Sequence, residues 1–90
     1  ALLGLNRCLS LELIKKNIRC NIINPGFIKT SYFNKFKRKK KLYNWTLNKI
    51  PLGRWGDSAE ISELVCFLLS DKSSYINGES INIDGGWLSS

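Results

Sequence analysis

The sequence predicts an α/β protein built on a parallel sheet, and three observations indicate this class. Residues 1 to about 16 carry leucines at helical spacing, and the apolar run 18–23 follows after a very short link. A second helical pattern begins at Asp57 and is followed by an alternating segment at 79–83. A helix followed at once by a strand is the second half of a βαβ unit, and such units build parallel sheets.

The first two elements each have a clear pattern. Leucines at positions 2, 5, 9 and 13 form an apolar stripe that Leu3, Leu11 and Ile14 widen, so we expect this helix to be covered on more than one side. Lys16 suits the end of a helix dipole, and Asn17 can take the left-handed conformation that ends a helix. The strand 18–23 is apolar on both faces, which predicts neighbouring strands and covering helices on both sides.

The later elements begin at a turn-rich stretch, Ile50–Gly56. Asp57 is a good N-cap, and Glu60 completes a capping-box pair three residues later. Apolar residues at 61, 64, 65, 68 and 69 then predict an amphipathic helix that ends near Ser70. Residues 73–78 are expected to form a loop, 79–83 a strand, and Asp84-Gly85-Gly86 its end.

Length and composition bound the protein further. Ninety residues allow at most one small domain, and no apolar run approaches the ~20 residues of a membrane span. The chain opens on Ala1 inside a helical pattern, without a signal peptide's basic start or cleavage site, which we interpret as a fragment. Two short strands are at best marginal alone, so further strands are expected upstream.

Cysteine and histidine usage points to a protein without a metal site. The chain has three cysteines, no CxxC pair and no histidine, so no zinc site is expected. Cys8, Cys20 and Cys66 each lie in an apolar stretch, where buried thiols are common. We therefore expect reduced, structural cysteines in a cytoplasmic protein.

The segment Asn24–Thr30 is the strongest candidate site. Pro25 cannot donate to a sheet ladder, so we expect the strand to stop there, and Gly26 permits φ > 0 and close approach of a ligand. In open α/β sheets, ligands bind beyond the carboxyl ends of the strands. Backbone N–H groups after Gly26 and the Thr30 hydroxyl would then be available to a cofactor. The alternative is an ordinary turn.

Residues 31–50, called the insert below, are polar, basic and aromatic. An insert of this length is usually a lid, a binding loop or disordered, and part of this one has a helical pattern. Tyr32, Phe33 and Trp45 could line an apolar substrate pocket or could pack the insert onto the body. Six positive charges stand among the seven positions Lys35–Lys41. They are either a solvated face or a surface that attracts an acidic substrate.

Six motifs, in order, resemble the C-terminal third of a classical short-chain dehydrogenase/reductase, most closely the 3-oxoacyl-carrier-protein reductase group. They are Leu3-Gly4-Leu5 with Leu9 and Glu12; Ile18-Arg19-Cys20-Asn21; Asn24–Thr30; Pro51–Gly56 with Glu60-Ile61; Phe67–Asp71; and Tyr75–Glu79 with Asp84-Gly85-Gly86. The resemblance covers essentially the whole chain. It implies the C-terminal part of a Rossmann-like doubly wound parallel sheet, with residues 1–90 belonging to one NAD(P)-binding domain.

The resemblance also implies a function and site residues. It implies an NAD- or NADP-dependent oxidoreductase that transfers hydride between nicotinamide and a carbonyl or alcohol substrate. The candidate substrates include acidic and acyl-carrier-linked compounds. The resemblance also implies a homodimer or homotetramer. The cofactor would be held by Pro25, Gly26, Phe27, Ile28 and Thr30, and the insert would be the substrate-binding loop. The family's catalytic Tyr-x-x-x-Lys is absent from this chain, and its Lys would fall just upstream of Ala1.

Two other function classes compete with this interpretation. The first is a non-catalytic oligomerisation module, formed by truncation of such an enzyme, and a Tyr-x-x-x-Lys upstream in the same reading frame would decide against it. The second is nucleic-acid binding through Lys35–Lys41 and the aromatic residues beside it. The near balance of charge elsewhere in the chain and the lack of a nucleic-acid fold signature argue against this second class.

Overall fold

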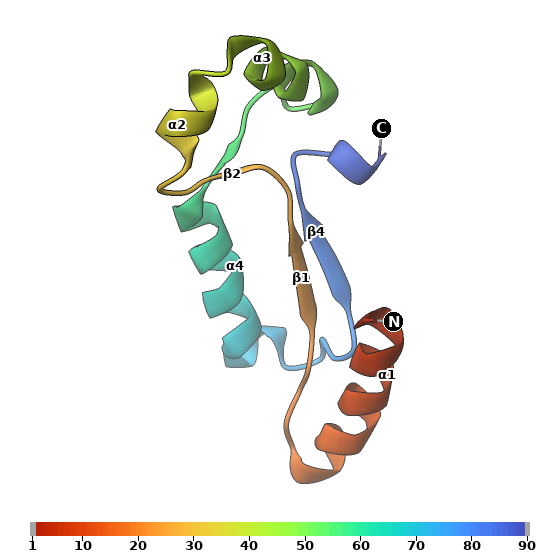
Figure 1. The fold of residues 1–90 in the computed structure, drawn as a ribbon. Helices are drawn as coiled ribbons and strands as arrows, with labels where there is room; N and C mark the ends of the chain where they lie inside the picture. Colours follow the sequence, from red (N-terminus) through yellow and green to blue (C-terminus); the bar gives the residue numbers. More distant parts are fainter. Residues whose placement is uncertain (1, 90) are drawn as a thin grey trace. The chain divides into compact units, whose positions relative to one another are not determined.

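A computed structural model describes residues 2–89 and confirms the α/β class. These residues form four helices and four strands, most of them labelled in Figure 1. They are α1 (Leu2–Leu13), β1 (Ile22–Pro25), β2 (Ile28–Lys29), α2 (Phe33–Lys37), α3 (Lys40–Lys49), β3 (Gly56–Asp57), α4 (Ser58–Leu69) and β4 (Ser80–Ile83). Short 3-10 turns cover Ile14–Lys16, Asp71–Ser73 and Trp87–Ser89.

The strands form two pairs, β1 with β4 and β2 with β3. The pair β2–β3 is parallel, with Ile28 opposite Gly56 and Lys29 opposite Asp57. In the pair β1–β4, Ile22 N–H donates to the Glu79 carbonyl (2.8 Å) and Gly26 N–H to the Ile83 carbonyl (3.0 Å). A step of four residues on one strand matches a step of four on the other, in the same direction, so this pair is parallel as well.

The described residues divide into two compact units. One holds the residues up to Asn24 together with Glu63–Ile81, and the other holds Pro25–Ser62 with the residues from Asn82 onward.

In the first unit, α1 packs through polar side chains rather than through its leucines. Asn6 and Ser10 are buried, and they contact the segment that leads into β4. Asn6 Nδ2 donates to the Glu79 carbonyl (3.4 Å), and Asn77 Nδ2 donates to the Ser10 carbonyl (3.2 Å). The apolar stripe is exposed, with Leu2 at 61% and Leu5 at 53%. The predicted cover over that stripe is therefore wrong within the described chain.

Strand β1 begins four residues later than the sequence predicts. The backbone of residues 18–21 is held by turns and side chains instead of a strand ladder: Ile18 N–H donates to the Leu13 carbonyl and Cys20 N–H to Asn77 Oδ1. The Arg19 guanidinium donates to carbonyls at the end of α4 and in the loop after it (Leu68, Ser70 and Ile76, at 2.8–3.2 Å). Hydrophobicity alone could not reveal these polar partners.

Four other sequence predictions fall on described residues. Asn17 has φ 63° and ψ 34°, which confirms the left-handed end after the first helix. The second predicted strand and the helix from Ser58 are present almost as expected. The expected burial of the cysteines is wrong for Cys8 and Cys66, which are exposed, while Cys20 is half-buried, and all three thiols are free.

The second unit has an aromatic core centred on Trp55, which is 5% exposed. Its ring centroid lies 5.0 Å from that of Phe27 and 5.1 Å from those of Phe33 and Phe36. Trp55 Nε1 donates to Thr46 Oγ1 (2.8 Å), and Thr46 is 1% exposed. The insert is mostly helical, and both of its helices, α2 and α3, pack their inner residues on this one indole ring.

Within residues 2–89, none of the helices combines the length and the hydropathy that a bilayer crossing requires.

Candidate functional site

The predicted cofactor segment lies where β1 ends and the chain continues into β2. Pro25 is the last residue of β1 rather than a residue beyond it, because a proline tolerates a strand end where no donor is required. Gly26 does not use the positive φ that glycine permits. A Cβ at position 26 would lie 2.7 Å from Asp84 Cβ and 2.8 Å from Asp84 Cα. The close approach at Gly26 is thus made by the chain itself.

Peptide geometry shows which backbone groups of this segment face away from their strand neighbours. The Phe27 carbonyl accepts from Gly56 N–H (2.9 Å) and therefore points toward β3. No cis peptide bond occurs in the described chain, and the C=O and N–H of a trans peptide point in opposite directions. The Ile28 N–H is therefore directed away from β3. By the same argument the Pro25 carbonyl is directed away from Ile83, to which Gly26 N–H donates.

Thr30 adds a hydroxyl at the end of the same segment. It is exposed, and its carbonyl accepts from Phe33 N–H (3.0 Å) at the start of α2. Its Oγ1 accepts a long bond from Tyr32 N–H (3.4 Å). Accepting this bond leaves the hydroxyl proton of Thr30 able to donate. The segment thus presents one backbone carbonyl, one backbone N–H and one hydroxyl.

The three aromatic residues predicted for the substrate loop lie in different surroundings. Phe33 belongs to the Trp55 core, where it also packs edge-on against Tyr43 at 5.9 Å. Tyr32 is 49% exposed, and its hydroxyl accepts from Lys39 Nζ (3.4 Å). Trp45 is 48% exposed and meets Trp87 edge-on at 5.6 Å. Phe33 thus packs in the core of the second unit, whereas Tyr32 and Trp45 are accessible to solvent.

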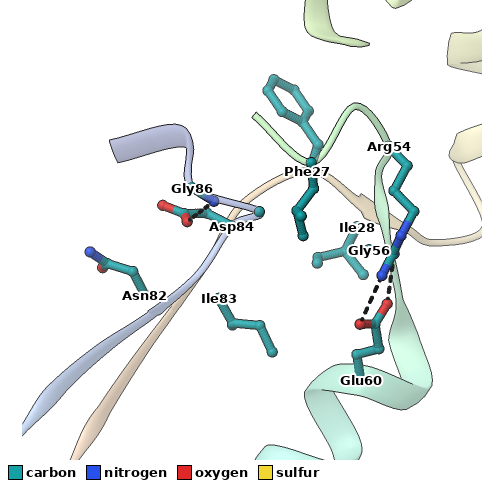
Figure 2. A pocket seen from close by; sticks show the side chains of 11 residues that line it. Phe27, Ile28, Arg54, Gly56, Glu60, Asn82, Ile83, Asp84 and Gly86 are labelled. Carbon is teal, nitrogen blue, oxygen red and sulfur yellow. Dashed lines mark hydrogen bonds and ion pairs between the residues drawn. The ribbon is translucent and has the colours of Figure 1, made fainter. Parts of the chain in front are cut away.

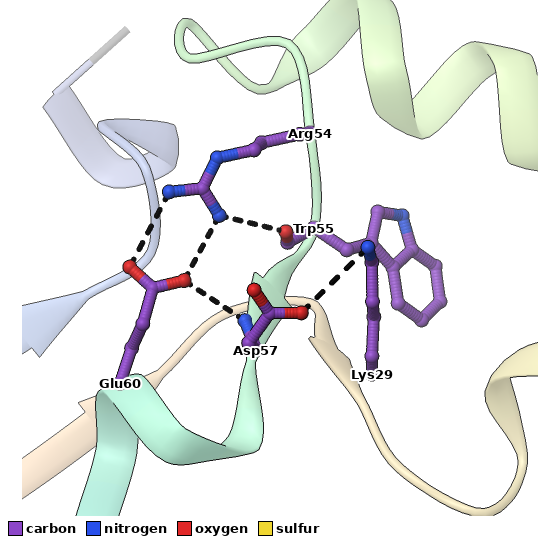
Figure 3. A network of polar contacts seen from close by, with 5 residues as sticks. All are labelled: Lys29, Arg54, Trp55, Asp57 and Glu60. Carbon is purple, nitrogen blue, oxygen red and sulfur yellow. Dashed lines mark hydrogen bonds and ion pairs between the residues drawn. The ribbon is translucent and has the colours of Figure 1, made fainter.

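A polar network fixes the return of the chain from the insert into α4 (Figure 3). Arg54 forms two bonds to the carboxylate of Glu60, at 2.9 and 3.3 Å. Glu60 Oε1 also accepts from Asp57 N–H (2.9 Å), which confirms half of the predicted capping box. Lys29 Nζ pairs with the Asp57 carboxylate at 3.7 Å, so β2 and β3 are joined by charge as well as by the ladder.

This network perturbs the titration of its members. The hydrogen bond from Arg54, followed by the one from Asp57 N–H, lowers the pKa of Glu60 from its ordinary value of 4.5 to about 2. The same bond to Glu60 raises the pKa of Arg54. A carboxylate whose pKa is depressed by folding stabilises the fold above its unfolded pKa. That contribution is lost as the pH falls toward the folded pKa.

We expect Glu60→Gln to lower the denaturation midpoint at neutral pH, and the difference from wild type to shrink between pH 4.5 and about 2. The reason is that protonated Glu60 makes no more charge-assisted bonds than Gln does. Chemical denaturation across this pH range measures it. Glu63→Gln, on the same helix, is the matched control, since no ion pair of Glu63 occurs among the described residues. A difference that stays constant with pH would contradict the prediction.

A small pocket of about 200 Å³ lies beside the segment, within the second unit (Figure 2). Its lining combines apolar side chains with charged groups and glycine backbone: Phe27, Ile28, Leu52, Arg54, Gly56, Glu60, Asn82, Ile83, Asp84, Gly85 and Gly86. Of the predicted cofactor residues, only Phe27 and Ile28 reach it, and none of the three predicted substrate-loop residues does. The predicted site residues therefore do not converge on this pocket.

Sequence reasoning missed two features of the site. The first is the pairing of β2 with β3, since two-residue strands carry no periodic signal. The second is the buried hydrogen bond from Trp55 Nε1 to Thr46 Oγ1, which joins residues nine positions apart. Thr46 lies in the last turn of α3, and Trp55 follows the turn after that helix. An aromatic residue and a hydroxyl on either side of a turn were the only available signal.

Known proteins are similar in sequence to this chain over nearly its full length. A family model described as enoyl-(acyl carrier protein) reductase matches residues 1–88. The chain is 42% identical to 3-oxoacyl-[acyl-carrier-protein] reductase FabG of Thermotoga maritima over 84 residues, which is 93% of this chain and 33% of that protein. It is also 42% identical to a tropinone reductase homolog of Arabidopsis thaliana over 87 residues, which is 97% of this chain and 33% of that protein. The chain thus spans about a third of these relatives.

Solved structures resemble the fold closely. The structure of 4-hydroxyisoleucine dehydrogenase complexed with NADH has a TM-score of 0.91 at 34% identity, covering 99% of this chain and 37% of that one. The structure of YwfH, an NADPH-dependent reductase involved in bacilysin biosynthesis, has a TM-score of 0.87 at 34% identity, covering 99% and 37%. These neighbours confirm that the α/β fold is Rossmann-like.

Proposed function

The chain belongs to the short-chain dehydrogenase/reductase family, and on that premise we propose that it forms the cofactor-clamping and substrate-loop part of an NAD(P)-dependent oxidoreductase. The observation that carries the proposal is the set of outward-directed groups at the end of β1. The Pro25 carbonyl, the Ile28 N–H and the Thr30 hydroxyl follow one another along a single short stretch of chain.

We also propose that residues 1–90 form the C-terminal part of one NAD(P)-binding domain. Two facts support that the chain is part of a larger domain. The chain spans about a third of the relatives it matches. Its described strands occur only in pairs, which are too few for an independently stable sheet. The catalytic Tyr and Lys of the family are proposed to lie before Ala1, because the chain holds no Tyr-x-x-x-Lys.

The donor and acceptor set fits the carboxamide of a nicotinamide. A primary amide offers one carbonyl acceptor and two N–H donors. The Ile28 N–H can donate to the amide oxygen, and the Pro25 carbonyl can accept from the amide nitrogen. NAD and NADP share this group, so the segment does not distinguish between them. When bound, either cofactor supplies hydride chemistry.

In this proposal the chain's own residues orient the cofactor. Gly26 and Phe27 are held by bonds to β4 and β3, so the outward groups on either side of them, the Pro25 carbonyl and the Ile28 N–H, are fixed before the cofactor arrives. Thr30 adds a donor to the carboxamide or to the pyrophosphate. Correct placement of reacting groups accounts for several kcal/mol of barrier in well-oriented systems.

Replacing Thr30 with valine tests the cofactor site. We expect the dissociation constant for NAD(H) or NADP(H) in the full-length protein to rise about 3- to 10-fold, the effect of one lost hydrogen bond. Titration by fluorescence measures it. Ser31→Ala removes the neighbouring exposed hydroxyl and should leave cofactor binding unchanged. Equal affinity in wild type and Thr30→Val would remove Thr30 from the site.

The proposed substrate is a carbonyl or alcohol compound that meets the insert, with Tyr32 and Trp45 as accessible contacts and Phe33 as the ring that holds α2 in place. Acidic and acyl-carrier-linked compounds are included, because a relative's name specifies an acyl-carrier protein substrate. We further propose a homodimer or homotetramer in the cytoplasm. The exposed leucines of α1 support an assembly that covers them.

A further inference from the structure

All the charged residues of the insert are basic. Its basic residues are Lys35, Lys37, Arg38, Lys39, Lys40, Lys41 and Lys49, and it contains no aspartate or glutamate. All six charges of Lys35–Lys41 are on exposed residues. The insert therefore carries a positive potential that its own residues do not neutralise.

Three of the amines of the second unit gather around two aromatic rings. Lys39 Nζ lies 3.4 Å from the Tyr32 hydroxyl. Lys37 Nζ lies 5.8 Å from the centroid of the Phe33 ring, and Lys29 Nζ lies 5.4 Å from it. Tyr32 and Phe33 are adjacent in sequence, so these amines flank one short stretch of the insert rather than the whole of α2 and α3.

The carboxylate partners of these amines are unevenly distributed. Lys29 pairs with Asp57 at 3.7 Å. Among the described residues no carboxylate lies within 4 Å of Lys37 or Lys39. Each contacts an aromatic side chain instead, and a cation beside a ring keeps its full charge. A positive site with an apolar wall and a phenolic hydroxyl suits a small molecule with an apolar part and an oxyanion.

We propose that Tyr32, Lys37 and Lys39 form an oxyanion-recognition site on the insert, through which the enzyme selects carbonyl substrates that carry a carboxylate or phosphate. This inference rests on the proposed function, since it names the substrate class of that enzyme. The ammonium groups attract the anion over several ångströms, and the Tyr32 hydroxyl can donate to it at close range.

Two probes that differ in one charge test the proposal, acetoacetate and its methyl ester. Their binding to the cofactor-loaded, full-length protein is measured by calorimetry, and kcat/KM is measured where turnover occurs. We expect the acid to bind about 10-fold more tightly than the ester at low ionic strength. The preference should shrink severalfold near 0.15 M salt, where the screening length is about 8 Å. Lys37→Gln/Lys39→Gln should remove most of it.

The matched control is Lys15→Gln/Lys16→Gln, which removes two exposed charges from the turn after α1, in the other unit. It should leave the preference for the acid intact. An equal loss in both double variants would mean that only net charge matters, and it would overturn the site. Failure of the acid to bind more tightly than the ester would also overturn it.

Two further measurements distinguish this site from a general anion-binding or nucleic-acid-binding surface. Inorganic phosphate carries the oxyanion without a carbonyl group, and it should compete with acetoacetate. If phosphate binds through Lys37 and Lys39 while the acid shows no preference over the ester, the site serves a free anion and the proposal fails. It also fails if duplex DNA binds through these lysines and acetoacetate does not. Absence of nicotinamide cofactor binding by the wild-type protein would instead overturn the proposed function itself.

Discussion

Replacing Gly26 with alanine should destabilise the protein by about 1–3 kcal/mol and weaken cofactor binding together with it. The new Cβ would stand 2.7 Å from Asp84 Cβ and 2.8 Å from Asp84 Cα. Real carbon atoms do not approach so closely, and Asp84 Cα belongs to the backbone, which cannot swing aside. The chain would have to separate at the bond from Gly26 N–H to the Ile83 carbonyl. That movement would also displace the Pro25 carbonyl and the Ile28 N–H.

Denaturant unfolding and cofactor titration of the full-length protein measure the two effects of Gly26→Ala. The matched control is Gly4→Ala, because a Cβ at Gly4 meets no atom within 4 Å and the position lies in α1. Alanine there should stabilise the helix by roughly 0.5–1 kcal/mol. Full stability of Gly26→Ala would show that close packing against Asp84 does not constrain this segment.

Replacing Trp55 with alanine should have the largest effect on stability, about 3–5 kcal/mol, the usual cost of truncating a buried large aromatic residue. The indole contacts Phe27 of the cofactor segment, Phe33 of α2 and Tyr43 of α3. Its removal should release α2 and α3 from Phe27, so substrate affinity should fall with stability. Thermal and chemical unfolding measure the first effect, and KM measures the second.

Two smaller changes separate the ring of Trp55 from its hydrogen bond. Trp55→Phe keeps an aromatic ring but loses the donor to Thr46 Oγ1, and Thr46→Val keeps the shape but leaves the indole N–H without its acceptor. Each should cost about 1–3 kcal/mol, less than Trp55→Ala. Trp45→Ala serves as the control for truncating a tryptophan, because Trp45 is 48% exposed. A similar cost for Trp45→Ala and Trp55→Ala would contradict the central place of Trp55.

The sequence predicted the helices better than the strands. The capping pair of Asp57 and Glu60 and the left-handed Asn17 depend on residues near one another in the chain, and both appear in the structure. The run 18–23 looked like one strand, yet Arg19, Cys20 and Asn21 bond to groups from beyond residue 67, and Ile18 bonds back to Leu13. Partners so distant in sequence leave no mark in local hydrophobicity.

For the candidate site, the sequence alone determined the position where β1 ends and the order of proline, glycine and hydroxyl that follows. These depend on the covalent limits of Pro25 and on the chemistry of Thr30, which any fold must respect. Only the tertiary structure decided that the contact with Asp84 requires glycine at position 26. It also decided that the Gly26 N–H and the Phe27 carbonyl point toward β4 and β3, while the Pro25 carbonyl and the Ile28 N–H point away from them. The physical reason is that the direction of a peptide group is set by its partner strand, and β3 and β4 arrive from far along the chain.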